Sequence, residues 1–204
     1  MTVTVLSAAQ AGLATALLCE AFAEYPVMRY VLGSAGDYGK RLQTLIGFFV
    51  TARVLREDLI LGVFDSSQLA GIALVTLPGD REAPASLAQR REAVWQDLGP
   101  AERRRYETFG AAAAQFVVPV PHHHLNMIGV RPARVGTGYA RILLDYVHQL
   151  ATNDAQSAGV SLSTETAANL SLYEHFGYQR LGSAKVSPEL ETWAFYRPSP
   201  GARL

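Results

Sequence analysis

The chain is poor in cysteine, in net charge and in long apolar runs, and each shortage excludes a class of protein. Its 204 residues include a single cysteine, Cys19, which excludes both an internal disulfide and a thiolate zinc site. Lysine plus arginine and aspartate plus glutamate number 18 each, so the formal net charge is zero. Because a broad nucleic-acid surface needs a basic excess, we expect no nucleic-acid partner.

Membrane and export signals are also missing. No uninterrupted apolar run reaches the length of a membrane-spanning helix. The first residues, MTVTVLSAAQ, lack the basic start and apolar core of a signal peptide. We therefore expect no membrane partner and a cytoplasmic location. Cys19 lies in the apolar stretch LATALLCEAF with no activating neighbour, which predicts a structural thiol rather than a nucleophile.

What is present indicates one mixed α/β domain over 1–204. The composition is 49% hydrophobic and 18% charged, as in ordinary globular proteins. Period-two patterns predict strands, and longer apolar periodicities predict helices. We expect strands at about 2–6, 59–64, 69–77, 122–130, 160–164, 178–183 and 191–196, and helices at about 7–22, 38–55, 140–151 and 168–176. The polar, arginine-rich segment 79–118 predicts a helical insertion between strands, and 197–204 a flexible tail.

One unit stands out, a strand, a glycine turn and a helix that read LNMIGV, RPARVGTGYA and RILLDYVHQL. Gly136 and Gly138 allow a tight turn, and the first N–H groups of a helix form an anion site. Taken alone, the pattern also fits a turn that binds nothing. A nucleotide P-loop is excluded because no Lys–Ser/Thr pair follows the glycines, and Ala140 does not have the spacing of a dinucleotide fingerprint.

Two blocks in the correct order resemble the GNAT superfamily of N-acetyltransferases. The first block matches at Val130, Pro132, Gly136, Gly138, Ala140 and Leu143–Leu144. The second block, NLSLYEHFGY, matches at Asn169, Tyr173, Glu174, Gly177 and Tyr178. Together they cover about a third of the chain. One departure is Val135, which stands where the family usually has Gln or Arg and puts a polar loop contact in doubt.

The resemblance implies an α/β (α+β) fold whose mixed, mostly antiparallel central sheet is splayed at the cofactor strand and flanked by helices. It implies acetyl-CoA (coenzyme A) as co-substrate and no metal. Backbone groups around Ile128, Gly129 and Val130 would pair with the pantetheine arm, and a loop would cradle the pyrophosphate, namely Val135, Gly136, Thr137, Gly138, Tyr139 and Ala140. Asn169 would contact the cofactor arm; the alternative is a helix N-cap.

The resemblance also assigns the acid, and the strand histidines offer a base. Tyr173 matches the family's general acid, which reprotonates the departing thiolate; the alternative is a core tyrosine. Strand alternation predicts that one face carries His122, His124, Asn126, Ile128 and Val130. His124 is our candidate base, with Glu20 and Glu24 as rivals. Three adjacent strand histidines cannot all face one metal ion.

These features predict an amine N-acetyltransferase that works by direct attack in a ternary complex. The acceptor would be a primary amine of a small molecule or a peptide. A non-catalytic acyl-CoA-binding or regulatory module is the alternative from another class, and a longer acyl donor or a hydroxyl acceptor is a third reading. The insertion at 79–118 would shape the acceptor site or a homodimer contact, while the acceptor itself stays open.

Overall fold

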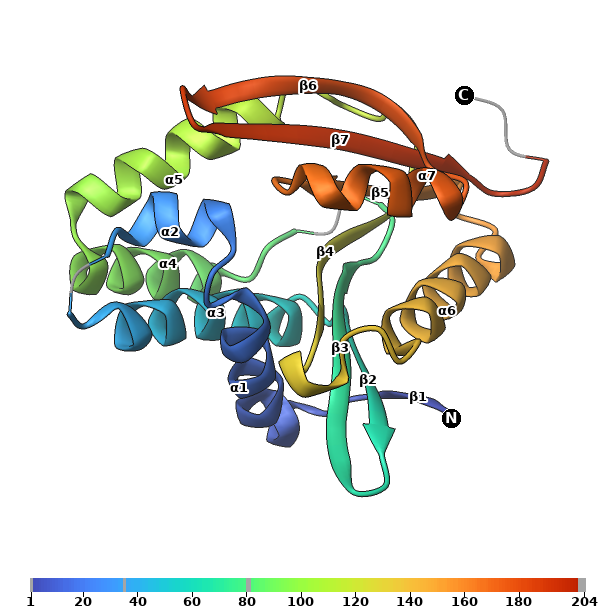
Figure 1. Ribbon diagram of the computed structural model, residues 1–204, viewed down its shortest axis with the longest axis horizontal. Helices are drawn as coiled ribbons and strands as arrows, with labels where there is room; N and C mark the ends of the chain where they lie inside the picture. Colours follow the sequence, from blue (N-terminus) through green and yellow to red (C-terminus); the bar gives the residue numbers. More distant parts are fainter. Residues whose placement is uncertain (1, 35, 80–81, 202–204) are drawn as a thin grey trace.

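A seven-stranded sheet forms the centre of the computed structural model, which describes residues 2–34, 36–79 and 82–201 (Figure 1). The strand order is β1-β2-β3-β4-β5-β7-β6, and every neighbouring pair is antiparallel except β4 with β5. This confirms the expected mixed, mostly antiparallel sheet. The strands are β1 Val3–Val5, β2 Leu59–Asp65, β3 Gln68–Thr76, β4 His123–Val130, β5 Gly159–Thr164, β6 Gln179–Ser187 and β7 Leu190–Pro198.

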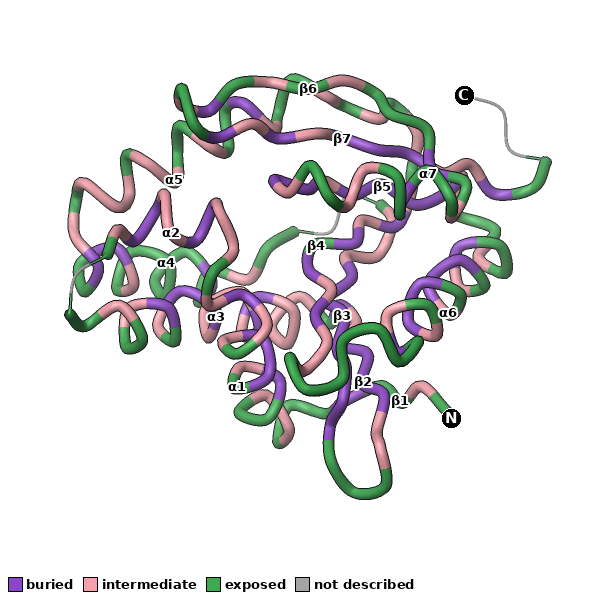
Figure 2. The backbone as a smooth tube through the Cα atoms, in the orientation of Figure 1, coloured by how far each residue is buried: buried purple, intermediate pink, exposed green. Residues whose placement is uncertain are grey.

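Helices cover both faces of the sheet. One face carries α1 to α5 and the other carries α6, with α7 beside the far end of β5 (Figure 1). Each face has its own apolar core, and the buried residues follow the strands and the inner helix faces (Figure 2). The helices are α1 Ala11–Phe22, α2 Pro26–Leu32, α3 Tyr38–Leu55, α4 Ala85–Leu98, α5 Pro100–Ala113, α6 Tyr139–Asn153 and α7 Leu170–His175, with 3₁₀ turns at Ala8–Gln10, Pro132–Arg134 and Ala167–Asn169. Among the described residues, none of these helices combines the length and apolarity needed to cross a bilayer.

The insertion between β3 and β4 is helical, as predicted, and consists of α4 and α5. Gly99 joins the two helices with φ +108, a conformation that favours glycine. Helix α5 packs on α2 and on β6. Just after it, the Phe116 ring lies against Gly182 of β6, where an added β-carbon would meet the ring at 2.4 Å. The insertion therefore bridges the helical layer and the β6–β7 hairpin.

Two local expectations need correction. No helix was expected between 22 and 38, but Pro26 is the first residue of α2, where a missing N–H costs nothing and the fixed φ suits a helix. The expectation of a flexible tail at 197–204 is wrong for its first residues, because Pro198 pairs with Gly159 in the sheet. Ser199 then bonds to the carbonyl oxygens of Ala158 and Ala151 at 2.9 and 3.2 Å. Residues 202–204 lie outside the described chain.

A β-bulge in β4 overturns the expected common face. Leu74 of β3 is opposite Met127, but Val75 is opposite Leu125, so Asn126 is an extra residue. Leu125 and the residues Ile128 and Val130 consequently pack on the α6 side, whereas Met127 packs on the α1 side. His124 faces away from Leu125, so it does not share a face with Ile128 and Val130. Strict alternation fails here because one inserted residue reverses every side chain beyond it.

Candidate active site

The two parallel strands β4 and β5 separate part-way along their length. They are paired only from His123–Leu125 to Val160–Leu162, although β4 continues to Val130 and β5 to Thr164. Backbone groups on the β5-facing edge of β4 beyond Leu125 are therefore available to a ligand that pairs like an added strand. This opening includes Ile128, Gly129 and Val130, the positions expected for the pantetheine arm.

The loop before α6 has the conformation that an anion cradle needs. Gly136 and Gly138 have φ of +82 and +93, and a β-carbon at either would have no other atom within 4 Å. The first helical bond runs from the Ile142 N–H to the Gly138 carbonyl at 3.1 Å. The preceding N–H groups, at Tyr139 to Arg141, therefore have no acceptor within the helix. Together with the helix dipole they fit a negatively charged diphosphate.

The departure at Val135 removes a polar side chain without closing this loop. The Val135 side chain is exposed, so it leaves the backbone accessible. Arg134 does not take the missing place, because its guanidinium forms an ion pair with Asp65 at 2.6 Å. Thr137 contributes to the loop's own order, since its hydroxyl donates to the Arg134 carbonyl at 2.6 Å. The site therefore offers mainly backbone donors.

A cavity of about 520 Å³ opens beside the separated strands. Its lining unites three residues that the sequence assigned to the site, His124, Asn169 and Tyr173, with Ile128 of the cofactor strand. The loop from Val135 to Ala140 is not part of this lining. The cavity and the glycine loop are therefore two separate parts of the surface, and the cavity holds the candidate acid and the candidate base.

Tyr173 is held firmly at the cavity by helix α7. Its ring centroid lies 5.8 Å from those of Tyr178 and Phe195. Gly177, with φ +83, ends α7, and the Tyr178 N–H donates to the Tyr173 carbonyl at 3.1 Å. Burial, with a smaller contribution from the charge of Glu165, raises the pKa of the Tyr173 hydroxyl to about 12. The hydroxyl thus stays protonated at neutral pH and can act as an acid.

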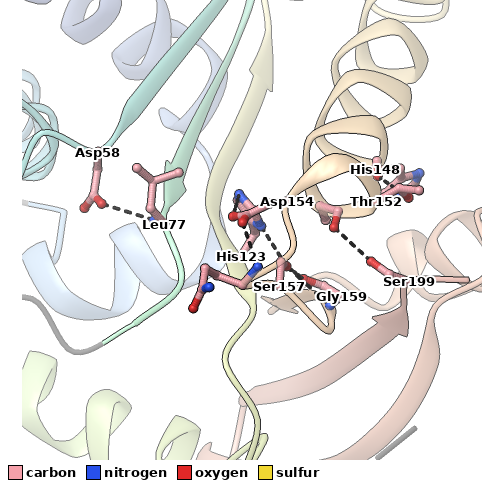
Figure 3. A network of polar contacts seen from close by, with 11 residues as sticks. Asp58, Leu77, His123, His148, Thr152, Asp154, Ser157, Gly159 and Ser199 are labelled. Atoms are coloured by element: carbon pink, nitrogen blue, oxygen red, sulfur yellow. Dashed lines mark hydrogen bonds and ion pairs between the residues drawn. The ribbon is translucent and has the colours of Figure 1, made fainter. Parts of the chain in front are cut away.

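The three adjacent histidines have three different partners. His124 has its Nδ1 2.7 Å from the Ser161 hydroxyl, and burial lowers its pKa to about 4, helped by the charges of His122 and Arg53. His123 faces the end of α6, where Ser157 and Asp154 contact it (Figure 3). His122 has its Nδ1 2.6 Å from the Val120 carbonyl oxygen. His124 is therefore neutral at pH 7.

Glu165 is a cavity residue that the sequence analysis missed. It follows β5 directly and is 8% exposed. The Thr192 hydroxyl donates to its Oε1 at 2.8 Å, and its own N–H donates to the Tyr25 hydroxyl at 3.0 Å. Burial raises the pKa of the Glu165 carboxyl. The available signal was a lone acidic residue just after an apolar strand, in VSLSTE, but nothing in the sequence placed it near Tyr173.

The rival carboxylates lie outside the cavity lining. Glu20 accepts two bonds from Arg131, both at 2.8 Å, and Glu24 forms an ion pair with Arg29. Asn169 precedes α7, but its side chain makes no capping bond; its Nδ2 donates to the Thr164 hydroxyl at 3.2 Å. Asn169 therefore lines the cavity without acting as a side-chain N-cap.

Neither a reactive thiol nor a cluster of metal ligands is found among the described residues. Burial raises the pKa of the half-buried Cys19 thiol to about 11, which agrees with an unreactive thiol. Within the part of the chain that the structure describes, no three His, Cys, Asp or Glu side chains gather where they could hold a metal ion.

Solved structures with this architecture are acetyltransferases for the most part. An acetyltransferase from Corynebacterium glutamicum, described as histone acetyltransferase HPA2 and related, is 20% identical, with a TM-score of 0.75 over 97% of this chain and 96% of that one. The chain has the GNAT fold. Arylalkylamine N-acetyltransferase 2 from Aedes aegypti is 14% identical, with a TM-score of 0.69 over 96% of each chain. The polyamine N-acetyltransferase of Drosophila melanogaster is 14% identical, with a TM-score of 0.64 over 97% of this chain and 99% of that one.

Comparison with family models and with curated proteins adds no name to this fold. No protein-family model matches the chain, and no curated protein matches it. At the identities given above, the solved structures establish the GNAT fold and not the substrate.

Proposed function

We propose that this GNAT-fold chain is an acetyl-CoA-dependent N-acetyltransferase that moves an acetyl group to a primary amine by direct attack in a ternary complex. The observation that carries the proposal is the cavity at the β4–β5 opening, which holds a protonated Tyr173 and a buried Glu165 together. The names of structural neighbours, which include arylalkylamine and polyamine N-acetyltransferases, support the same reaction class.

Acetyl-CoA would supply a thioester-activated acetyl group. The β4 backbone from Ile128 to Val130 would hold its pantetheine arm, with Asn169 as a side-chain contact. The backbone from Val135 to Ala140 would hold the pyrophosphate, since the two glycines leave that loop open and its N–H groups are unsatisfied within the helix.

Two side chains would move the protons. As the new N–C bond forms, a carboxylate at Glu165 accepts the proton that the amine loses. As the C–S bond breaks, the Tyr173 hydroxyl donates its proton to the sulfur, which leaves as a neutral thiol. The site returns to its starting state when the proton on Glu165 passes to the Tyr173 phenolate, and both side chains line the same cavity. Atoms and charge then balance over one turnover.

Glu165 and His124 are the two candidate bases, and burial shifts their pKa values in opposite directions. A general base works best when its pKa lies near the working pH. Burial moves the Glu165 pKa upward, toward neutrality, but moves that of His124 down to about 4. Glu165 is therefore the better proton acceptor, and His124 stays a second candidate through its bond to Ser161.

A non-catalytic acyl-CoA module is the alternative. Such a module would need the loop and the open strand edge, but it would have no use for a buried carboxyl group beside a buried phenol. Groups with pKa values displaced by burial in a cavity are typical of catalytic sites. Glu165 and Tyr173 therefore favour an enzyme. A homodimer, a cytoplasmic location and a peptide acceptor remain further parts of the proposal.

Calorimetric titration with acetyl-CoA tests the proposal. We expect micromolar binding to the wild type and none to Gly138→Trp, which fills the cradle at a positive-φ glycine. Gly201→Trp is the matched control, since Gly201 has φ +82 and equally open surroundings but lies at the end of the chain. Thiol release with an amine library then separates an enzyme from a binding module. If the folded wild type does not bind acetyl-CoA, the proposal is wrong.

A further inference from the structure

Aromatic rings make up much of the cavity lining. They come from elements that are distant in the sequence, and they are Phe22, Phe49, Tyr106, Phe109, Phe116 and Phe195. Half of them belong to α5 and the residues just after it, so the helical insertion supplies much of this wall. An apolar, aromatic lining favours a ligand with a large apolar group.

The core of the wall is a pair of rings that is already in place. Phe49 of α3 and Tyr106 of α5 are stacked, with ring centroids 6.0 Å apart and planes inclined by 30°. Trp95 of α4 supports Tyr106 at 5.0 Å from the other element of the insertion. Because these rings are fixed by packing in the absence of ligand, a flat apolar group would bind there with little loss of side-chain freedom.

The charged residues that line the cavity also limit which acceptors can bind. Among the described lining residues, Glu165 is the one carboxylate and Arg53 the one Lys or Arg. The Arg53 guanidinium donates hydrogen bonds to the side-chain oxygens of Thr76 and Asn126, and it forms an ion pair with Asp58 at 3.4 Å. A second ammonium on the acceptor would meet this guanidinium instead of a carboxylate. An acceptor carboxylate would have to compete with Asp58 for it.

On the basis of the proposed function, we infer that the acceptor is a hydrophobic primary monoamine. Its aromatic ring, or an apolar group of similar bulk, lies against the Phe49–Tyr106 wall, and its amino group reaches Glu165. Polyamines and free amino acids are poor acceptors, because the cavity offers neither a second carboxylate nor an unengaged cation. The nitrogen gains the acetyl carbon and gives its proton to Glu165, as above.

The test compares three amines of similar reach: 2-phenylethylamine, putrescine and phenylalanine. Each is titrated by calorimetry into wild-type protein saturated with coenzyme A, which cannot react, and each is assayed for turnover with acetyl-CoA. We expect 2-phenylethylamine to bind at least about tenfold more tightly than the other two, with the same order in kcat/KM. Equal or tighter binding of putrescine or phenylalanine would overturn the inference.

Substitutions of two adjacent phenylalanines test whether 2-phenylethylamine binds against Phe49. Phe49→Ala removes one ring of the stacked Phe49–Tyr106 pair and should raise the dissociation constant and the KM for 2-phenylethylamine about tenfold or more. Phe48→Ala is the matched control, because Phe48 neighbours Phe49 on α3 but does not line the cavity. Equal effects of the two changes would also overturn the inference. If the wild type does not bind coenzyme A, the proposed function itself is wrong. Failure of the proposed function and failure of this inference are therefore distinguishable.

Discussion

The proposed cofactor side and the proposed acceptor side of this molecule are built in different ways. Apart from Asn169, the proposed cofactor side is one continuous stretch, β4 followed by the glycine loop and α6, within 123–153. The proposed acceptor side collects aromatic rings from α1, α3, α5, the residues just after α5, and β7. Binding through the backbone needs a local chain conformation, which neighbouring residues encode. Binding through side chains depends on which elements pack together, so its residues are scattered.

The proposed proton-transfer residues line the same cavity as these rings. Tyr173 comes from a recognisable motif, whereas Glu165 follows an ordinary strand and belongs to no motif. If acetyl-CoA and the amine bind to separate regions, a substitution on the cofactor side should change the binding of acetyl-CoA alone. A substitution on the acceptor side should change the binding of the amine alone.

The largest expected effect comes from Tyr173→Phe. Without the hydroxyl, the thiolate would leave unprotonated, and kcat should fall by about 10²–10⁴ while the dissociation constant for acetyl-CoA stays unchanged. Steady-state kinetics and calorimetry measure the two quantities. Tyr178→Phe is the control, since the Tyr178 hydroxyl bonds to His148 at 3.1 Å outside the cavity. An unchanged kcat would make Tyr173 a core residue only.

Glu165→Gln should lower kcat about 10²-fold, because the amide cannot accept the amine proton. In the wild type, kcat/KM should rise with pH as the Glu165 carboxyl ionises, at a pH above the ordinary range of a glutamate, since burial raises its pKa. The variant should lose this rise, and His124→Gln should keep it. If Glu165→Gln keeps the rise in kcat/KM with pH and His124→Gln loses it, the base is His124.

Glu165→Gln should also change how the free energy of unfolding depends on pH. Since the folded pKa of Glu165 is raised, the folded state binds more protons than the unfolded state between the ordinary and the raised value. The carboxyl therefore lowers the free energy of unfolding as the pH rises through that window. Glu165→Gln removes this cost and should be at least as stable as the wild type at neutral pH in urea unfolding. A clear loss of stability would point to a structural role.

The smallest effect is expected from Gly182→Ala on the acceptor side. The new methyl group would press on the Phe116 ring at 2.4 Å, so the insertion should shift and stability should fall by about 1–3 kcal/mol. The amine KM should change while the acetyl-CoA dissociation constant does not. Gly110→Ala on α5, with nothing within 4 Å, should leave both unchanged. A change in acetyl-CoA affinity would contradict the separation of the two sides.

Much of the fold was open to prediction because it follows from local patterns. The strands, the main helices and the helical insertion agree with the expected ranges, and Gly136, Gly138 and Gly177 adopt positive φ. Helix α2 was missed because Pro26 indicates both a helix end and a helix start. The face of His124 was misjudged because the bulge at Asn126 leaves no signature in a single sequence.

By itself, the sequence determined the order of elements, the glycine loop before α6 and the position of Tyr173 in its motif, since each depends on neighbouring residues. Only the tertiary structure decided the rest. It separated β4 from β5, brought Glu165 and Tyr173 into one cavity and stacked Phe49 on Tyr106 across 57 positions of chain. Such contacts arise where distant elements share one core, and no local propensity encodes which of them will meet.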